Sequence, residues 1–220
     1  MGTLILLGIG AGAVVLFRYF SEERRVKRRI RKTPAFALRD LPEAQEARVI
    51  GQAVVLHEHL VGPLSGRACV AYTAKVEQNL SDDGTGFWET LVIETRIVPF
   101  VLEDGTGRAI VDGAAARVAL DFDSSSTSSK SDDPTAAERA FLERHGARDQ
   151  GWVFNKRLRY REAIIAIGET ISVLGSGTRE PDPQAAPVDY RGGQPTLIRL
   201  TSSPRYPLVI SDDPATTRSD

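Results

Sequence analysis

Cysteine is nearly absent from this sequence of 220 residues, because Cys69 is the only one. A single cysteine excludes a disulfide framework within the chain and any zinc module built from several Cys ligands. No cofactor is therefore predicted. Cys69 lies in an apolar stretch, where a buried and unreactive thiol is expected.

Apolar runs of membrane length are also scarce, since only one occurs. Residues 4–17 contain no charged side chain. A helix over residues 4–20 would be about 26 Å long, at the short end of what crosses a hydrocarbon core of roughly 30 Å. Arg18 would reach the headgroups and the two aromatic residues after it would lie at the interface, so residues 1–20 are predicted to be a transmembrane anchor. Its marker residues are Leu4, Leu16, Arg18, Tyr19 and Phe20.

The alternative to a retained anchor is a cleaved signal peptide. No Lys or Arg precedes the apolar run, and bulky residues follow it at 17–20, so the retained span is favoured. Gly8 and Gly12 form a G-x-x-x-G pair, a pattern typical of helix dimerisation, which makes a homodimer through these glycines one hypothesis.

A basic juxtamembrane segment, residues 21–33, follows the anchor. Because basic residues stay on the cytoplasmic side, the rest of the chain is predicted to lie in the cytoplasm. The same side chains are expected to contact anionic lipid headgroups. The basic residues are Arg24, Arg25, Lys27, Arg28, Arg29, Arg31 and Lys32.

Positive charge is scarce in the remaining sequence. Outside the anchor and the basic segment there are 20 Lys and Arg against 27 Asp and Glu, a net charge of about −7. Since nonspecific nucleic-acid affinity depends on basic residues, nucleic acid is not expected as a partner. Arginine outnumbers lysine 23 to 5, a bias common in GC-rich bacterial genomes.

Strand patterns dominate residues 34–210. Apolar and β-branched runs predict strands, and Pro99 interrupts the longest run, so it is expected at a bend or an edge. The predicted strands are 48–56, 68–77, 87–102, 108–112, 152–165, 168–178, 196–200 and 206–210. The fold class is therefore mostly β (all-β or α+β), either an OB-like small barrel or a β-sandwich.

Three other segments complete the organisation. Residues 121–133 are polar and of low complexity, which predicts a mobile loop. One inserted helix is predicted at 134–145, with Asp133 as its cap and Gly146 at its end. Residues 211–220 lack core-forming side chains and are predicted to be a disordered tail.

Three groups of short motifs follow the predicted membrane helix. Their residues are, in order, Pro63, Gly66 and Cys69, then Pro99, Phe100, Asp104 and Gly107, then Glu162, Gly168 and Gly175. Together, in this order, they resemble the GIDE domain, also called BAM ("beside a membrane"). This is the module of the mitochondrial RING ubiquitin ligase MULAN and its prokaryotic relatives, and the resemblance covers residues 34–210.

The resemblance implies a β module that lies against a membrane and contacts a protein or ligand there. The eukaryotic ligases also have a second span and a C-terminal RING that binds zinc. This sequence has no second apolar run of that length, and one cysteine cannot build a RING. No catalytic residue is therefore predicted, and the protein is not expected to be an enzyme.

Candidate chemistry is limited to His57-Glu58-His59, where two imidazoles at i and i+2 have a spacing seen in metal sites. A third ligand would have to come from elsewhere, for example His145. A solvent-facing strand end is the simpler interpretation. Three functional classes remain: a noncatalytic membrane-anchored interaction or sensor module with an unknown protein partner, an accessory subunit of an envelope enzyme or transporter, and a metal-dependent hydrolase.

Overall fold

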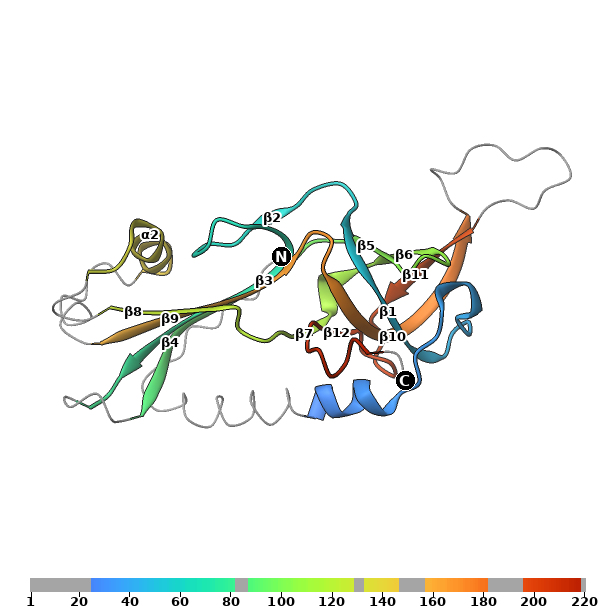
Figure 1. Ribbon diagram of the computed structural model, residues 1–220, viewed down its shortest axis with the longest axis horizontal. Helices are drawn as coiled ribbons and strands as arrows, with labels where there is room; N and C mark the ends of the chain where they lie inside the picture. Colours follow the sequence, from blue (N-terminus) through green and yellow to red (C-terminus); the bar gives the residue numbers. More distant parts are fainter. Residues whose placement is uncertain (1–24, 82–86, 129–132, 147–156, 182–195, 219–220) are drawn as a thin grey trace, which may run out of the picture.

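A computed structural model of the protein describes residues 25–81, 87–128, 133–146, 157–181 and 196–218. Two β units lie end to end along the long axis of the molecule (Figure 1). One is a barrel, and the other is an extended sheet with a helix on one face. The mostly β prediction with one inserted helix is confirmed.

Five strands close the barrel: β1 (Glu46–Val55), β5 (Phe100–Glu103), β6 (Arg108–Val111), β11 (Thr196–Thr201) and β10 (Thr170–Pro181). They pair in the order β1-β5-β6-β11-β10, and β10 pairs back to β1. Only β6 and β11 run parallel. The closed ring supports the barrel alternative over the sandwich.

Two short strands extend the barrel sheet beyond β10. β12 (Val209–Ser211) pairs with β10, and β7 (Arg117–Ala119) pairs with β12. Two 3-10 turns, η1 (Leu38–Asp40) and η2 (Gly113–Ala115), flank the barrel strands.

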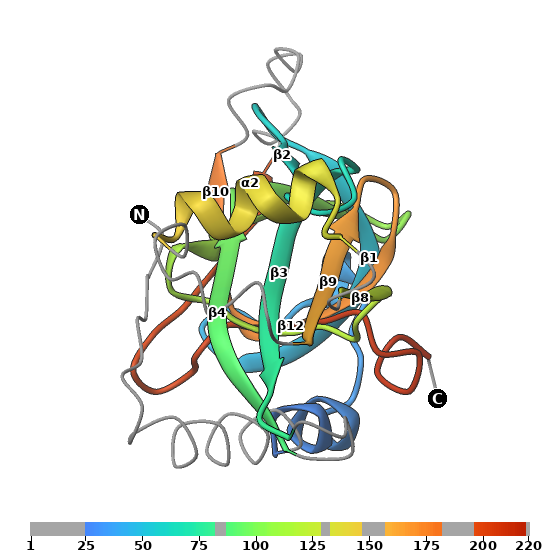
Figure 2. The same cartoon turned by 90° about the vertical axis from the view of Figure 1, so that its left-hand side faces the viewer.

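The extended sheet is built around β3 (Ala68–Asn79). β9 (Leu158–Ala166) pairs along one side of β3, and β4 (Trp88–Ile97) pairs along the other. Two shorter strands complete it: β2 (Leu60–Val61) next to the start of β3, and β8 (Ser124–Ser128) outside β9. Figure 2 shows the strands side by side, with α2 crossing over them.

Pro99 lies where the chain leaves one sheet and enters the other. The single apolar run predicted at 87–102 is divided into β4, in the extended sheet, and β5, in the barrel. Proline has no N–H for a sheet ladder, so its position between strands fits the predicted bend. The backbone N–H of Val98 donates to Val70 O (3.0 Å) and holds the crossing point to β3.

The helix α2 (Ala136–Arg144) begins with a capping box. Thr135 Oγ1 accepts from Glu138 N, and the Glu138 carboxylate accepts from Thr135 N. The predicted cap, Asp133, is therefore wrong, because Thr135 stands at the position from which a side chain reaches the N3 amide. Gly146, with φ of 75°, follows the helix as predicted.

Two segments predicted to lack order contain regular structure in the parts that are described. Within 121–133, residues 124–128 form β8, because their backbone completes the edge of β9 even though the side chains are polar. Within 211–220, the described part continues from β12 into turns, and Thr216 is fully buried. Strand pairing orders the first segment, and turn hydrogen bonds to Asp213 order the second.

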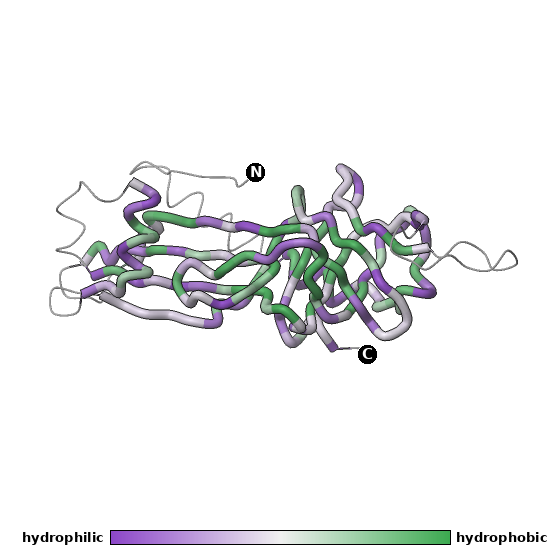
Figure 3. The backbone as a smooth tube through the Cα atoms, turned by 90° about the horizontal axis from the view of Figure 1, so that it is seen from above, coloured by the Kyte–Doolittle hydropathy of each residue, from purple (hydrophilic) through white to green (hydrophobic). Residues whose placement is uncertain are grey.

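One apolar core runs from the barrel into the extended sheet. Ile171 and Val173 of β10 are fully buried in it, and Ser172 and Leu174 are fully buried as well, so both faces of this part of β10 are covered. Figure 3 shows hydrophobic stretches gathered in the barrel, whereas hydrophilic stretches recur along the extended sheet.

Candidate functional site

The predicted anchor, residues 1–20, lies outside the described residues, as does Arg24. Within the described ranges, no helix has the length and apolar character needed to cross a bilayer. The site nearest to the predicted membrane is therefore the helical segment at residues 25–32, which is defined here as the basic helix.

One face of the basic helix packs on the barrel. Ile30 is fully buried, and it forms a small apolar cluster with Leu174 of β10 and Val209 of β12, against which Val26 also packs. Val26 and Ile30 are one helical turn apart, so they lie on the same face. The charge pattern of this segment predicts only a basic run, whereas its docking depends on the apolar pair Val26 and Ile30.

Ion pairs add to this docking. Lys27 Nζ binds the carboxylate of Asp121 and lies 3.4 Å from Asp213 Oδ2, and Arg29 binds Glu46. Burial acts to lower the pKa of Lys27, but the hydrogen bond and charge of Asp121, followed by those of Asp213, outweigh it and raise that pKa. Lys27 therefore stays charged in this interface.

Arg48 of β1 connects the basic helix to the C-terminal segment. Its side chain is buried, with the residue 2% exposed. Nη1 donates to Ile30 O (3.4 Å) and Thr33 O (3.3 Å), while Nη2 donates to Arg218 O (2.5 Å). A buried guanidinium needs such acceptors, because an unpaired buried charge is strongly unfavourable.

The other face of the basic helix is exposed. Its exposed basic residues include Arg25, Arg28, Arg31 and Lys32. The basic segment thus divides into a docked side and a free cationic side. Figure 1 shows the helix along one flank of the barrel.

Asp212 lies next to this interface and is an unusual acid. Its carboxylate accepts from the backbone N–H of Asp121 (Oδ1, 2.9 Å). Burial is the main cause that raises the pKa of Asp212 to about 7, and the negative charges of Asp121 and Glu169 act in the same direction. Asp212 is the only described carboxylate whose pKa is raised that far.

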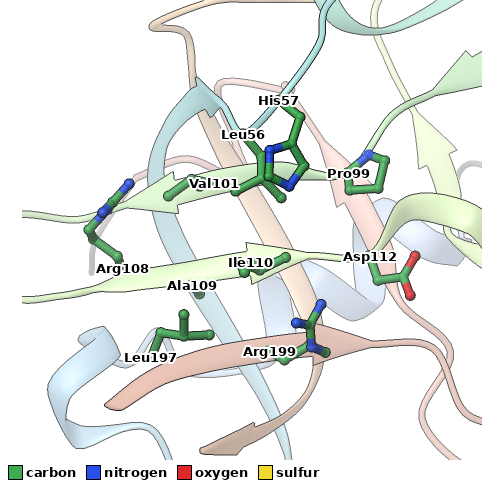
Figure 4. A pocket seen from close by; sticks show the side chains of 10 residues that line it. All are labelled: Leu56, His57, Pro99, Val101, Arg108, Ala109, Ile110, Asp112, Leu197 and Arg199. Atoms are coloured by element: carbon green, nitrogen blue, oxygen red, sulfur yellow. The ribbon is translucent and has the colours of Figure 1, made fainter. Parts of the chain in front are cut away.

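A second candidate site is a groove on the outer surface of the barrel, across β5, β6 and β11 (Figure 4). Its volume is about 340 Å³, within the range of small-molecule sites. Apolar side chains form most of its lining, and two guanidiniums, one imidazole and one carboxylate lie around them. The lining residues are Leu56, His57, Pro99, Val101, Arg108, Ala109, Ile110, Asp112, Leu197 and Arg199.

The structure does not bring the three histidines together. His57 and His59 are exposed in the segment between β1 and β2. His145 is the C-terminal cap residue of α2 in the extended sheet unit, where its Nε2 lies 2.8 Å from Glu94 Oε2. Within the described residues, no group of three or more His, Cys, Asp or Glu could hold a metal ion.

Several family-motif residues organise turns. Asp104 accepts from Leu38 N (2.6 Å), Thr106 N (2.8 Å) and Gly107 N (3.0 Å), which ties η1 to the β5–β6 turn. Burial opposes it, but these hydrogen bonds lower the pKa of Asp104. Asp104 therefore acts as a structural cap.

Glu162 holds a second turn. This buried carboxylate of β9 accepts from Leu64 N (2.8 Å) and Ser65 N (3.1 Å) and so fixes the turn between β2 and β3. Pro63 and Gly66 belong to that turn, and Gly66 has φ of 71°. Neighbouring Cys69 is fully buried, and burial, followed by the charge of Glu162, raises its pKa to about 11.

The remaining motif residues serve packing and turns. Phe100 is fully buried in the core. A Cβ on Gly175 would lie 2.5 Å from Leu208 Cδ1, so any larger residue there requires the Leu208 side chain to shift. Gly168, with φ of 85°, forms the β9–β10 turn. The motifs therefore describe the framework, and the basic helix and groove lie mostly outside them.

Comparison with known families agrees with this framework. The model of the GIDE family, described as E3 ubiquitin ligase, matches residues 73–202, more than half of the chain. Neither a curated protein nor a solved structure matches. The matched range begins within β3 and ends just after β11, so it includes most of both β units. The chain belongs to the GIDE family.

Proposed function

We propose that this protein is a membrane-anchored, noncatalytic interaction or sensor module of the GIDE family. Its β domain would recognise a partner or ligand close to the cytoplasmic face of a bilayer. Residues 1–20 would hold the chain in the membrane, and no step of ubiquitin transfer is assigned to it, because one cysteine cannot supply a RING.

The observation that carries the proposal is the docking of the basic helix. Arg48, Ile30 and Lys27 fix this helix to the barrel, so the segment that follows the predicted anchor is not a free linker. A fixed helix would give the barrel one orientation relative to the bilayer. Its free basic side would then face anionic headgroups, at up to about 1 kcal/mol per basic residue.

Membrane extraction tests the anchor. The full chain should stay in the membrane pellet at alkaline pH, whereas a chain without residues 1–20 should be released. Release of the full chain would contradict the proposal.

Lipid analysis tests the orientation. Anionic lipid that co-purifies with the full chain should fall in the double variant Arg25→Gln/Arg28→Gln. The matched control, Arg139→Gln/Arg205→Gln, removes two exposed arginines that lie off the basic helix and should change nothing. Equal loss in both variants would argue against a membrane-facing helix.

The second candidate, an accessory subunit of an envelope enzyme or transporter, is favoured by the edge of the extended sheet. β4 has ten residues and pairs with no described strand other than β3. An exposed edge strand is a template for a strand from another chain. A photo-crosslinker at Glu89 or Arg96 should then capture one stoichiometric membrane protein, and a crosslinker at exposed Arg205 should not.

A further inference from the structure

The groove on the barrel is divided chemically. Val101 of β5 pairs with Ile110 of β6, and Ile110 pairs with Arg199 of β11, so one row across three strands changes from apolar to cationic. Figure 4 shows these side chains on one surface, with His57 across the groove from Arg199. Such a surface suits a ligand that has an apolar body and one charged end.

One ion pair orients the Arg199 guanidinium and leaves its other hydrogen-bond donors available. Its Nε donates to Glu180 Oε2 (2.8 Å), and among the described residues no contact engages Nη1 or Nη2. Arg108 has the same arrangement with Glu103 Oε1 (2.9 Å), but its side chain is more exposed, at 50% against 36% for Arg199. A guanidinium oriented through Nε presents its two terminal amino groups as a fork that matches a carboxylate.

We propose that this groove binds a small amphipathic organic carboxylate. The carboxylate pairs with the free fork of Arg199, and the apolar body lies on Val101, Ile110 and Leu197. At about 30 Å³ for each water-sized group, 340 Å³ holds a ligand of roughly ten non-hydrogen atoms. This inference deepens the proposed recognition role by naming a ligand class, and it rests on that role and not on membrane anchoring.

Two features of the site restrict the ligand further. Asp112 lies at one end of the groove. Its carboxylate would repel a second negative charge on the ligand, so the groove should favour a ligand with a single negative charge. The basic helix packs on β10 and β12, whereas the groove lies on β5, β6 and β11, of which β5 and β6 do not pair with β10 or β12. The groove therefore faces away from the predicted bilayer, which favours a water-soluble anion over a lipid headgroup.

Calorimetry with two isosteric probes tests the proposal. The full chain, kept in mild detergent so that no anchoring is required, is titrated with 4-phenylbutyrate and with its neutral amide, and detergent without protein provides the reference. The acid should bind at least about tenfold more tightly than the amide, because a charge-assisted bidentate contact is lost with the amide. No binding of the acid, or equal binding of both probes, would overturn the proposal.

Variants locate the two ends of the ligand. Arg199→Gln should reduce the affinity for the acid to that for the amide, and Ile110→Ser should weaken both probes. Arg205→Gln, an exposed arginine away from the groove, is the matched control. Unchanged binding in Arg199→Gln, or a larger loss in Arg108→Gln, would refute the assignment to Arg199. Failed membrane anchoring would leave these titrations unaffected, so the two proposals fail separately.

Discussion

The barrel and the extended sheet belong to one continuous core but are stabilised differently. The barrel interior is apolar, with Val49, Phe100, Val173 and Leu200 all fully buried. The extended sheet instead buries charge: Lys75, Glu77 and Glu162 are each at most 3% exposed. Apolar burial is tolerant of geometry, whereas buried charges need specific partners. The barrel is therefore a scaffold, and the extended sheet depends on a polar network.

The polar network of the extended sheet is centred on Glu77. Its carboxylate accepts from Lys75 Nζ (2.5 Å) and from Arg159 (2.7 Å to Nη2), and Arg159 also stacks on Trp88 at 4.3 Å. Further along the same pair of strands, Glu94 joins Tyr72, Arg144 and His145, which attaches α2 to β4. These contacts hold the sheet and its helix together at points where the barrel uses apolar side chains.

The largest expected effect is on the barrel. Val173→Asp should destabilise the protein by at least about 5 kcal/mol, comparable with the whole stability of a domain, because it places a carboxylate in an apolar core. Thermal melts followed by circular dichroism should show no cooperative transition. Thr170→Asp, at an exposed position of the same strand, should melt close to the parent protein. A folded Val173→Asp would contradict the barrel core.

A charge deletion should affect the extended sheet nearly as strongly. Glu77→Gln leaves Lys75 and Arg159 without their shared carboxylate, so a loss of about 3–5 kcal/mol is expected from chemical denaturation. Glu103→Gln removes an exposed ion pair with Arg108 and should cost only about 0–1 kcal/mol. If the two variants lose equal stability, the contrast between the two regions is wrong.

Asp212, next to the basic helix, should make the folding stability fall as the pH rises. A carboxyl group whose pKa is lowered by folding has the opposite effect. Since the pKa of Asp212 is raised from 3.8 to about 7 by folding, the folded state favours the protonated form. The contribution of protonated Asp212 to the free energy of unfolding is fully present below pH 3.8 and is lost as the pH rises towards 7. Asp212→Asn should therefore stabilise the protein at pH 8, by about 2–4 kcal/mol, and little at pH 4.

The comparison for Asp212 is Asp104, whose pKa is lowered by its hydrogen bonds. Asp104→Asn should lower the folding stability at pH 8, and the difference from the parent protein should disappear as the pH falls below about 4. Denaturation midpoints at both pH values separate the two cases. If both substitutions stabilised the protein at pH 8, burial of the Asp212 carboxylate would not be the cause of the effect of Asp212→Asn.

The smallest expected effect concerns the cap of α2. Thr135→Ala removes the acceptor for Glu138 N and should cost about 0.5–2 kcal/mol. Asp133→Ala, which removes the residue first predicted to cap the helix, should be nearly neutral. Calorimetric melts measure the stability of both variants. A larger loss in Asp133→Ala than in Thr135→Ala would show that Asp133 is the cap of α2.

Strand positions could be predicted because local patterns determine them. The run at 168–178 contains apolar and β-branched residues, and Pro99 interrupts the run at 87–102, so β10 and the division between β4 and β5 follow from sequence. Which strands pair does not follow, because β1 meets β10 through contacts more than a hundred residues apart. In β3, Tyr72-Thr73-Ala74-Lys75 alternates as a one-sided strand would, yet both faces are buried.

The candidate site was less predictable than the fold. The family-motif residues proved to be structural, since turns and tight packing restrict Asp104, Glu162 and Gly175 strongly. Groove residues such as Val101, Ile110 and Arg199 come from three strands, and only tertiary pairing brings them together. The helix pair Val26 and Ile30 was the one local signal for docking that the sequence did contain.

Arg48 makes the two ends of the described chain mechanically dependent on each other. One guanidinium binds both the end of the basic helix, at Ile30 and Thr33, and the C-terminal segment, at Arg218. A load applied to the C-terminus, whether a fused reporter or a pulling tether, would therefore act on the same residue that secures the membrane-proximal helix. Removing the last few residues would release one acceptor of a buried cation and loosen the attachment at the opposite end of the chain.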